Sequence, residues 1–234
     1  MIISGLQKMT LLDYPGKVAC TVFFQGCNFR CPFCHNSDLL TAHAQQSITE
    51  DELLSFLGKR RGLLDAVCIS GGEPTLQEDL PGLLRAIRAL GYSVKLDTNG
   101  SRPDMLHRLL DEHLVDYVAM DVKNSPDRYA MTCGMERMDL SPIEESLRLL
   151  MRGVVPYELR TTVSVPLHDE TSVRLMGEWL ASLSGNTAIP ALYIQPFVDR
   201  DSVPDHSLSS PEECVLHEFV TILCPYVEHV SIRG

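Results

Sequence analysis

The sequence lacks features that define several large classes of protein. None of its apolar runs, such as residues 18–24, approaches the roughly 20 residues that a membrane-spanning helix needs. The first residues show no basic stretch followed by an apolar core, so the sequence predicts no export signal. Positive charge is not in excess, because the 234 residues carry a net charge of −11. We therefore expect a cytoplasmic protein that binds neither a membrane nor a nucleic acid.

Two common catalytic patterns are also missing, a phosphate-binding glycine loop and a Ser, His and Asp arrangement. The sequence has instead a cysteine triplet. Cys27, Cys31 and Cys34 are spaced C-x3-C-x2-C within eight residues, so their thiolates can face one inorganic centre. A [4Fe–4S] cluster normally takes four cysteines, and a local triplet therefore leaves one iron open to a substrate or cofactor.

Two other interpretations of the triplet are open. With His35 as fourth ligand it could form a structural zinc site, although zinc ligands usually come as two separated pairs. Disulfides are less favoured, because tight triplets in cytosolic proteins more often bind metal or act catalytically. The other five cysteines form no second motif and receive no assigned role: Cys20, Cys68, Cys133, Cys214 and Cys224.

Apolar, β-branched runs alternate with segments of helical period along the whole chain. The predicted strands are residues 18–24, 65–70, 92–98, 115–122, 157–165 and 192–197, with a short one at 227–232. The predicted helices are residues 49–62, 77–90, 103–113, 141–152, 171–182 and 211–223. This rhythm implies parallel βαβ units in a single domain, 1–234. Six units fall short of the eight of a closed barrel, so we predict an α/β fold, a partial, laterally open (β/α)6 barrel.

Polar residues stand where each predicted strand ends, and chemistry in such folds gathers at that rim. The cysteine loop follows the first strand, and Ser70-Gly-Gly-Glu-Pro-Thr75 follows the second. The later strands end with Asp97 and Thr98, with Asp121 and Lys123, with Arg160, and with Gln195. Six polar strand ends on one rim predict a single site.

The motifs on this rim also have structural interpretations. The glycines before Glu73 free backbone amides for a ligand, but the same run suits a strand-to-helix turn. The carboxylates of Asp97 and Asp121 would converge and need a cation or a shared proton, unless both merely cap loops. Thr98 adds an oxygen there, and Lys123 could balance an anionic ligand group.

The triplet followed by Gly-Gly-Glu-Pro on the next strand resembles the radical S-adenosylmethionine (SAM) superfamily. Asp13-Tyr-Pro-Gly-Lys17, Phe24-Gln-Gly-Cys-Asn28 and Cys34-His-Asn36 are similar to the glycyl-radical-enzyme activases. Among these, the resemblance is greatest to anaerobic ribonucleoside-triphosphate reductase activating proteins, with the pyruvate formate-lyase activase a near relative. It implies that a reduced cluster cleaves SAM, and that the 5′-deoxyadenosyl radical takes a hydrogen from a glycine of a partner enzyme. A flavodoxin- or ferredoxin-type protein would donate the electron.

The resemblance also implies residue roles. Cys27, Cys31 and Cys34 would hold three irons of the [4Fe–4S] cluster, with no catalytic side chain beyond the cluster and SAM ligands. The cofactor-binding residues would be Phe33 at adenine, Gly71, Gly72 and Glu73 at the methionine ammonium, Asp97, Lys123 at its carboxylate, Arg160 near the ribose, and Gln195. Asp97, Thr98 and Asp121 match the ligands of a monovalent cation, Na⁺ or K⁺.

One departure bears on the partner. The formate-lyase branch has a histidine in a Leu-Pro-Tyr-His run on the sixth strand, whereas this chain has Ile194-Gln-Pro-Phe-Val198. That difference favours the reductase as partner. Alternative hypotheses are an activase of another glycyl radical enzyme such as pyruvate formate-lyase, a small-molecule enzyme similar to 7-carboxy-7-deazaguanine synthase, and an electron-transfer module.

Overall fold

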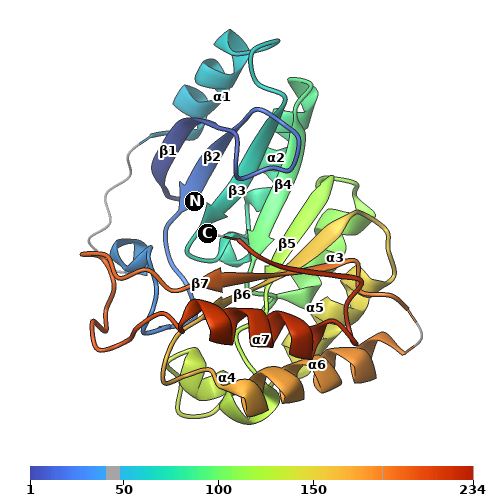
Figure 1. The fold of residues 1–234 in the computed structure, drawn as a ribbon. Coiled ribbons are helices and arrows are strands. Elements are labelled where there is room, and N and C mark those ends of the chain that lie inside the picture. The colour runs from blue at the N-terminus through green and yellow to red at the C-terminus, as the bar shows by residue number, and fades with distance from the viewer. Residues whose placement is uncertain (41–47, 186, 234) are drawn as a thin grey trace.

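The computed structural model describes residues 1–40, 48–185 and 187–233, and within them the chain forms one curved sheet with helices on its outside (Figure 1). The eight strands lie in chain order. They are β1 (Ile3–Thr10), β2 (Ala19–Phe24), β3 (Ala66–Gly71), β4 (Ser93–Thr98), β5 (Tyr117–Asp121), β6 (Tyr157–Val163), β7 (Ala191–Pro196) and β8 (His229–Ile232).

The sheet is an open barrel of parallel strands with one antiparallel edge. Strands β2 to β8 pair in parallel, and β1 pairs antiparallel with β2. Because β1 and β8 are the two edges, the barrel is open at its side. This arrangement confirms the predicted α/β partial barrel and adds β1, which the sequence analysis missed because its residues do not alternate cleanly between apolar and polar.

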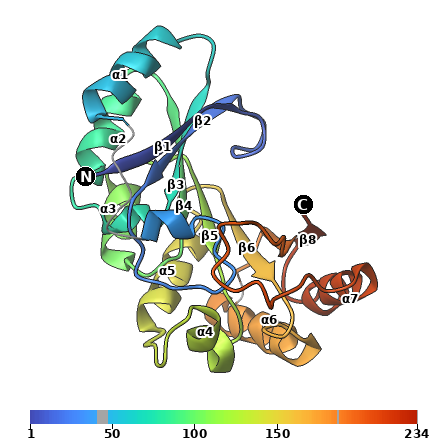
Figure 2. The ribbon, with the colours of Figure 1, turned by 90° about the vertical axis from the view of Figure 1, so that its left-hand side faces the viewer.

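Helices connect the parallel strands. The α-helices are α1 (Glu50–Lys59), α2 (Leu80–Ala89), α3 (Pro103–Asp111), α4 (Pro126–Thr132), α5 (Ser141–Met151), α6 (Glu170–Ser184) and α7 (Glu213–Leu223), with 3₁₀ helices η1 (Ser37–Leu40) and η2 (Pro74–Leu76). Figure 2 shows α1, α2, α3 and α5 along one side of the strands. The structure adds α4 to the predicted helices and begins α2 three residues later than predicted, because residues 77–79 form a turn between η2 and α2.

Local sequence signals explain where several helices begin. The predicted capping box of α1 is present, since Thr49 accepts from the Glu52 N–H and Glu52 reaches back to the Thr49 N–H. A proline occupies the first turn of α2, α3, α4 and α5, where its missing N–H costs nothing. None of the helices in the described ranges is both long and apolar enough to cross a membrane.

The core lies between the helices and the outer face of the sheet. Leu106 and Leu109 of α3 and Leu147 of α5 are almost fully buried, and each such side chain contributes roughly 1.5–3 kcal/mol through burial. This packing fixes the strand ends, and with them the loops that carry the polar rim.

Candidate active site

The cysteine loop after β2 is held by backbone hydrogen bonds to three other segments. The Gly26 N–H donates to the Leu39 carbonyl at 2.9 Å, and the Glu73 N–H donates to the Gly26 carbonyl at 2.7 Å. The Arg30 N–H donates to the carbonyl of Cys133 at 2.8 Å. The loop is therefore attached to the turn after β3 and to the end of α4 as well as to its own continuation.

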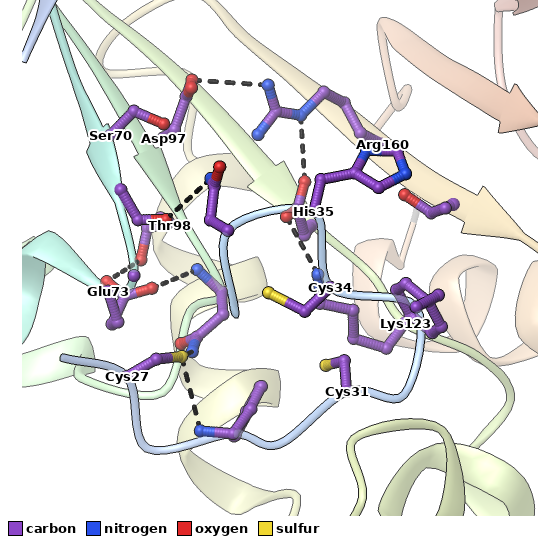
Figure 3. Close-up of a pocket in the computed structure, with 18 of the residues that line it drawn as sticks. Cys27, Cys31, Cys34, His35, Ser70, Glu73, Asp97, Thr98, Lys123 and Arg160 are labelled. Carbon is purple, nitrogen blue, oxygen red and sulfur yellow. Dashed lines mark hydrogen bonds and ion pairs between the residues drawn. The ribbon is translucent and has the colours of Figure 1, made fainter. Parts of the chain in front are cut away.

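The thiols of Cys27, Cys31 and Cys34 face the same space as Glu73 and Lys123 (Figure 3), a cavity of about 260 Å³. All three thiols are free. Burial raises the pKa of Cys27 to about 11 and also raises the pKa of Cys34. The neighbouring Cys133 thiol lowers the pKa of Cys31 to about 7. Cys31 therefore becomes a thiolate, the form that binds metal, more readily than the other two.

The donor set fits an iron–sulfur cluster. In the described part of the chain, no three His, Cys, Asp or Glu side chains are already gathered at the spacing of a single metal ion. A cluster does not require that spacing, because each thiolate binds a different iron. Three free thiols on one loop, facing one cavity, therefore suit three irons of a cluster.

His35 does not complete a zinc site with the triplet. Its Nε2 lies 2.7 Å from the carbonyl of Val198, and its ring stacks on Phe197 at 6.1 Å between centroids. The hydroxyl of Ser202 donates to the His35 carbonyl at 2.7 Å, and the Asp205 N–H donates to the Pro32 carbonyl at 3.1 Å. His35 thus joins the irregular segment 198–205 to the cysteine loop.

The glycines after β3 allow a close approach of two backbone segments. A side chain at Gly72 would place its Cβ 2.0 Å from the Gly26 carbonyl oxygen. Gly71 has a φ of +119°, and a Cβ there would lie 2.3 Å from the Phe24 backbone nitrogen. Both positions therefore require glycine, and the absence of a side chain lets the turn pack directly against the cysteine loop.

The Glu73 carboxylate is fully buried and accepts several hydrogen bonds. Its donors include the Asn99 N–H at 2.6 Å, the Thr98 hydroxyl at 2.8 Å, the Thr75 N–H at 3.1 Å, and the Thr75 hydroxyl. Burial raises the pKa of Glu73, although these donors oppose the rise. Glu73 therefore ties the ends of β3 and β4 together beside the cavity.

Charged residues from three adjacent strands form an ion-pair network. Arg160 of β6 donates through Nε to Asp121 Oδ1 at 2.9 Å, and its Nη1 lies 3.5 Å from Asp97 Oδ1. Lys123 Nζ lies 3.0 Å from Asp121, and Lys95 Nζ lies 2.6 Å from Asp97. The two carboxylates that the sequence analysis expected to need a cation or a shared proton are thus offset by three protein cations.

The network also determines protonation. Burial disfavours the charged form of Asp121, but the charges of Arg160 and Lys123 outweigh it and lower the pKa to about 2. The pKa of Asp97 is likewise lowered, because Arg160 and Lys95 outweigh its burial. Burial alone would lower the pKa of Lys123, yet Asp121 raises it above its usual value. Asp97, Asp121 and Lys123 are therefore all charged at neutral pH.

Every predicted site residue lines this one cavity. The set comprises Cys27, Cys31, Phe33, Cys34, Gly71, Gly72, Glu73, Asp97, Thr98, Asp121, Lys123, Arg160 and Gln195. Phe33 is buried, and Lys123 Nζ lies 5.9 Å from the centroid of its ring.

Two residues beside the cysteines and the charges were missed. Asn99 donates through Nδ2 to the Cys27 sulfur at 3.7 Å and to Asn28 at 3.0 Å. The sequence signal that could have identified Asn99 is its position directly after Asp97 and Thr98, at the same strand end. Lys95 is almost fully buried. Its side chain points to the same face of β4 as that of Asp97, two residues later, and this was the only sequence signal for its place inside the barrel.

Comparison with known proteins agrees with this geometry. Residues 21–174 match the Radical SAM superfamily. A Methanocaldococcus jannaschii protein, whose name assigns it to the glycyl-radical enzyme activating enzymes, is 32% identical over 99% of this chain and 95% of its own. The pyruvate formate-lyase-activating enzyme of Clostridium pasteurianum is 34% identical, but the match spans only 53% of each chain.

A solved structure supports the fold. The crystal structure of a domain of the pyruvate-formate lyase-activating enzyme from Bacteroides vulgatus superposes with a TM-score of 0.59, covering 73% of this chain and 99% of that domain at 23% identity. The superfamily match covers well over half of the chain, and the M. jannaschii relative extends the likeness to nearly all of it. The chain therefore belongs to the radical SAM superfamily and, within it, to the group of glycyl-radical enzyme activating enzymes.

Proposed function

We propose that this chain binds a [4Fe–4S] cluster and SAM in the cavity and installs a glycyl radical on anaerobic ribonucleoside-triphosphate reductase. The observation that carries the proposal is the meeting of three free thiols with the glycine turn and Lys123 in one cavity. When bound, the cluster and SAM supply the carbon-centred radical that removes a hydrogen atom from a glycine. The protein's own residues bind and orient these groups.

The residues have distinct proposed roles. Cys27, Cys31 and Cys34 hold the cluster. Gly71 and Gly72 present the backbone to the SAM ammonium group, and Glu73 keeps that turn in place through its buried hydrogen bonds. The cavity residues assigned to the rest of SAM are Phe33 for adenine, Lys123 for the carboxylate, and Asp97, Arg160 and Gln195 for the polar groups of the nucleoside.

A monovalent cation, Na⁺ or K⁺, is part of the proposal. The oxygens available to it belong to Asp97, Thr98 and Asp121, which all face the cavity. Since Asp121 already pairs with Lys123 and Arg160, the cation requires one of those pairs to loosen when SAM enters. Reconstitution in K⁺ should then give tighter SAM binding than reconstitution in tetramethylammonium; equal affinities would remove the cation from the account.

The identity of the partner rests on the end of β7. Gln195 faces the cavity in the run Ile194-Gln-Pro-Phe-Val198, which resembles the reductase group more than the formate-lyase branch. A second candidate is pyruvate formate-lyase, since a relative that activates it, by its name, is 34% identical over about half the chain. A flavodoxin- or ferredoxin-type protein is the proposed electron donor in either case.

Side-by-side activation distinguishes these partners. The reconstituted, reduced protein and SAM would be incubated anaerobically with each enzyme, and a glycyl-radical doublet would be sought by EPR. Variants of each partner with the radical glycine replaced by alanine are matched controls. We expect a doublet with the reductase alone. A doublet only with pyruvate formate-lyase would reassign the partner, and 5′-deoxyadenosine without any doublet would point to a different substrate.

A further inference from the structure

A second ion pair lies inside the barrel, two residues before Arg160 on the same strand, and the proposed function does not use it. Glu158 of β6 is completely buried. Its Oε1 accepts a hydrogen bond from Arg233 Nη1 at 2.7 Å, and its Oε2 accepts one from Nη2 at 3.0 Å. The Tyr117 hydroxyl donates to the same Oε2 at 3.0 Å. A carboxylate at this depth is costly unless it is paired, and Arg233 supplies the compensating charge.

Arg233 reaches Glu158 from the edge of the sheet, across the neighbouring strand. It directly follows β8, and its N–H donates to the Ile194 carbonyl of β7 at 2.8 Å. Its guanidinium carbon lies 3.4 Å from the centroid of the Tyr193 ring. One side chain thus joins β8, β7 and β6 at the open side of the barrel. The stacking and the paired hydrogen bonds orient the guanidinium group, which a lysine could not reproduce.

Glu158 and Arg160 lie on the same face of β6, because side chains two residues apart in a strand point the same way. Their backbones are separated by roughly 7 Å, a span that a long arginine side chain can cover. Among the residues that the structure describes, Glu158 has no ion-pair partner except Arg233. Without Arg233, the buried Glu158 carboxylate would therefore compete with the present partners of Arg160 for its guanidinium group.

We propose that Arg233 is a positioning residue for the SAM site, because its pairing with Glu158 leaves Arg160 free to face SAM. Arg160 then keeps its bridge between Asp97 and Asp121. The inference rests on the proposed function, which assigns Arg160 to polar groups of the nucleoside. Arg233 is not among the residues that line the cavity, so its effect on SAM passes through the other two side chains.

The test measures equilibrium SAM binding to the reconstituted protein, under conditions where urea unfolding shows each variant to be fully folded. Arg233→Gln should bind SAM about tenfold more weakly, the size expected when one charge-assisted hydrogen bond is lost. Arg233→Lys keeps the charge but not the paired geometry, and should lose about threefold. The double variant Glu158→Gln with Arg233→Gln should return to within about twofold of the wild type, because no buried anion is left to attract Arg160.

Arg88→Gln is the matched control. The side chain of Arg88 is 34% exposed, close to the 37% of Arg233, but its partner Asp116 is 35% exposed whereas Glu158 is completely buried. The control should bind SAM as the wild type does. A crystal structure of cluster-free Arg233→Gln gives a second readout, in which the Arg160 guanidinium should lie within hydrogen-bonding distance of Glu158.

Several results would overturn the inference. Unchanged SAM affinity in Arg233→Gln, with only a lower free energy of unfolding, would make Arg233 a purely structural residue. A double variant as weak as the single one would show that the charge of Glu158 is not involved. In the crystal structure, an Arg160 that still bridges both aspartates would contradict the competition.

If Arg233→Gln does not fold, Arg233→Lys decides, and unchanged SAM affinity in that variant would overturn the inference. If the wild type itself binds no SAM, the proposed function has failed, and this is seen before any variant is measured. The crystal structure of the cluster-free variant then still tests whether Arg233 keeps Glu158 from pairing with Arg160.

Discussion

The Nε of Arg160 lies 2.9 Å from Oδ1 of Asp121, and the same guanidinium reaches Asp97 at 3.5 Å. A cation from β6 thus bridges carboxylates at the ends of β4 and β5. The side chains of Arg160 and Asp97 are about 15% and 14% exposed, so solvent screens the arrangement only weakly. The relationship explains how two acidic residues coexist at the rim of the cavity.

Replacing Arg160 by Gln should destabilise the protein strongly. Two mostly buried carboxylates would lose their shared cation and keep only Lys95 and Lys123 as partners. The cost should therefore approach, without reaching, the roughly 3–5 kcal/mol typical of a buried charge left with no partner. Urea unfolding of the cluster-free protein measures the loss. Arg85→Gln is the matched control, because the Arg85 pair with Glu112 is largely exposed and should matter little. Equal effects of the two substitutions would contradict a stabilising role for the bridge.

Glu73→Gln should weaken both folding and SAM binding while leaving iron content intact. The NH2 of the new amide would face a backbone N–H from which the carboxylate now accepts a hydrogen bond. One buried donor would then lose its partner, at a cost of about 1–3 kcal/mol. The displaced turn should lower SAM affinity about tenfold, or 1.4 kcal/mol. Urea unfolding and equilibrium SAM binding measure the two effects. Unchanged SAM affinity would remove the Glu73 turn from the binding site.

His168 should make the protein less stable as the pH falls. The ring is buried, which lowers its pKa, and it is held neutral because Nε2 lies 2.8 Å from the Lys123 carbonyl while Nδ1 accepts from the Ser164 N–H at 3.2 Å. The unfolded chain takes up a proton near its usual pKa of about 6.5, whereas the folded chain does not until lower pH. The stabilising contribution is therefore present above that value and is lost progressively below it.

Urea unfolding at several pH values between neutral and mildly acidic would measure this effect. His168→Gln should flatten the pH dependence, whereas His107→Gln, at an exposed position of α3, should leave it as in the wild type. An equally steep dependence in His168→Gln would show that other groups carry it.

Gly72→Ala should disturb the proposed cluster and SAM site. The added Cβ would lie 2.0 Å from the Gly26 carbonyl oxygen, so the cysteine loop would have to move. We expect reduced iron retention and weaker SAM binding. Gly82→Ala is the matched control, because Gly82 lies in α2 with nothing within 4 Å of the added Cβ, and alanine should stabilise that helix by about 0.5–1 kcal/mol. Full iron retention in Gly72→Ala would contradict the close packing of turn and loop.

Much of the fold was predictable because its signals are local. Apolar runs, the Thr49 and Glu52 capping box and the prolines at helix starts lie within single elements. The antiparallel strand β1 was not predictable in this way, because its formation depends on pairing with β2 rather than on its own pattern. The short helix α4 gives little periodic signal in seven residues.

The site was predictable where residues stand at strand ends, since parallel strands bring those ends together. What the sequence could not supply was the pairing between them. Lys95 and Arg160 neutralise the two aspartates, and the Arg30 N–H donates to the Cys133 carbonyl although about a hundred residues separate them along the chain. Such contacts depend on register and loop packing, which no local pattern encodes.

The most direct measurement follows the hydrogen atom. The partner reductase would be prepared with glycine deuterated at Cα and incubated anaerobically with the reduced, reconstituted protein and SAM, and the 5′-deoxyadenosine would be analysed by mass spectrometry. The account predicts deuterium in the 5′-deoxyadenosine, in an amount equal to the glycyl radical formed. Unlabelled 5′-deoxyadenosine, or none from protein with its full iron content, would contradict it.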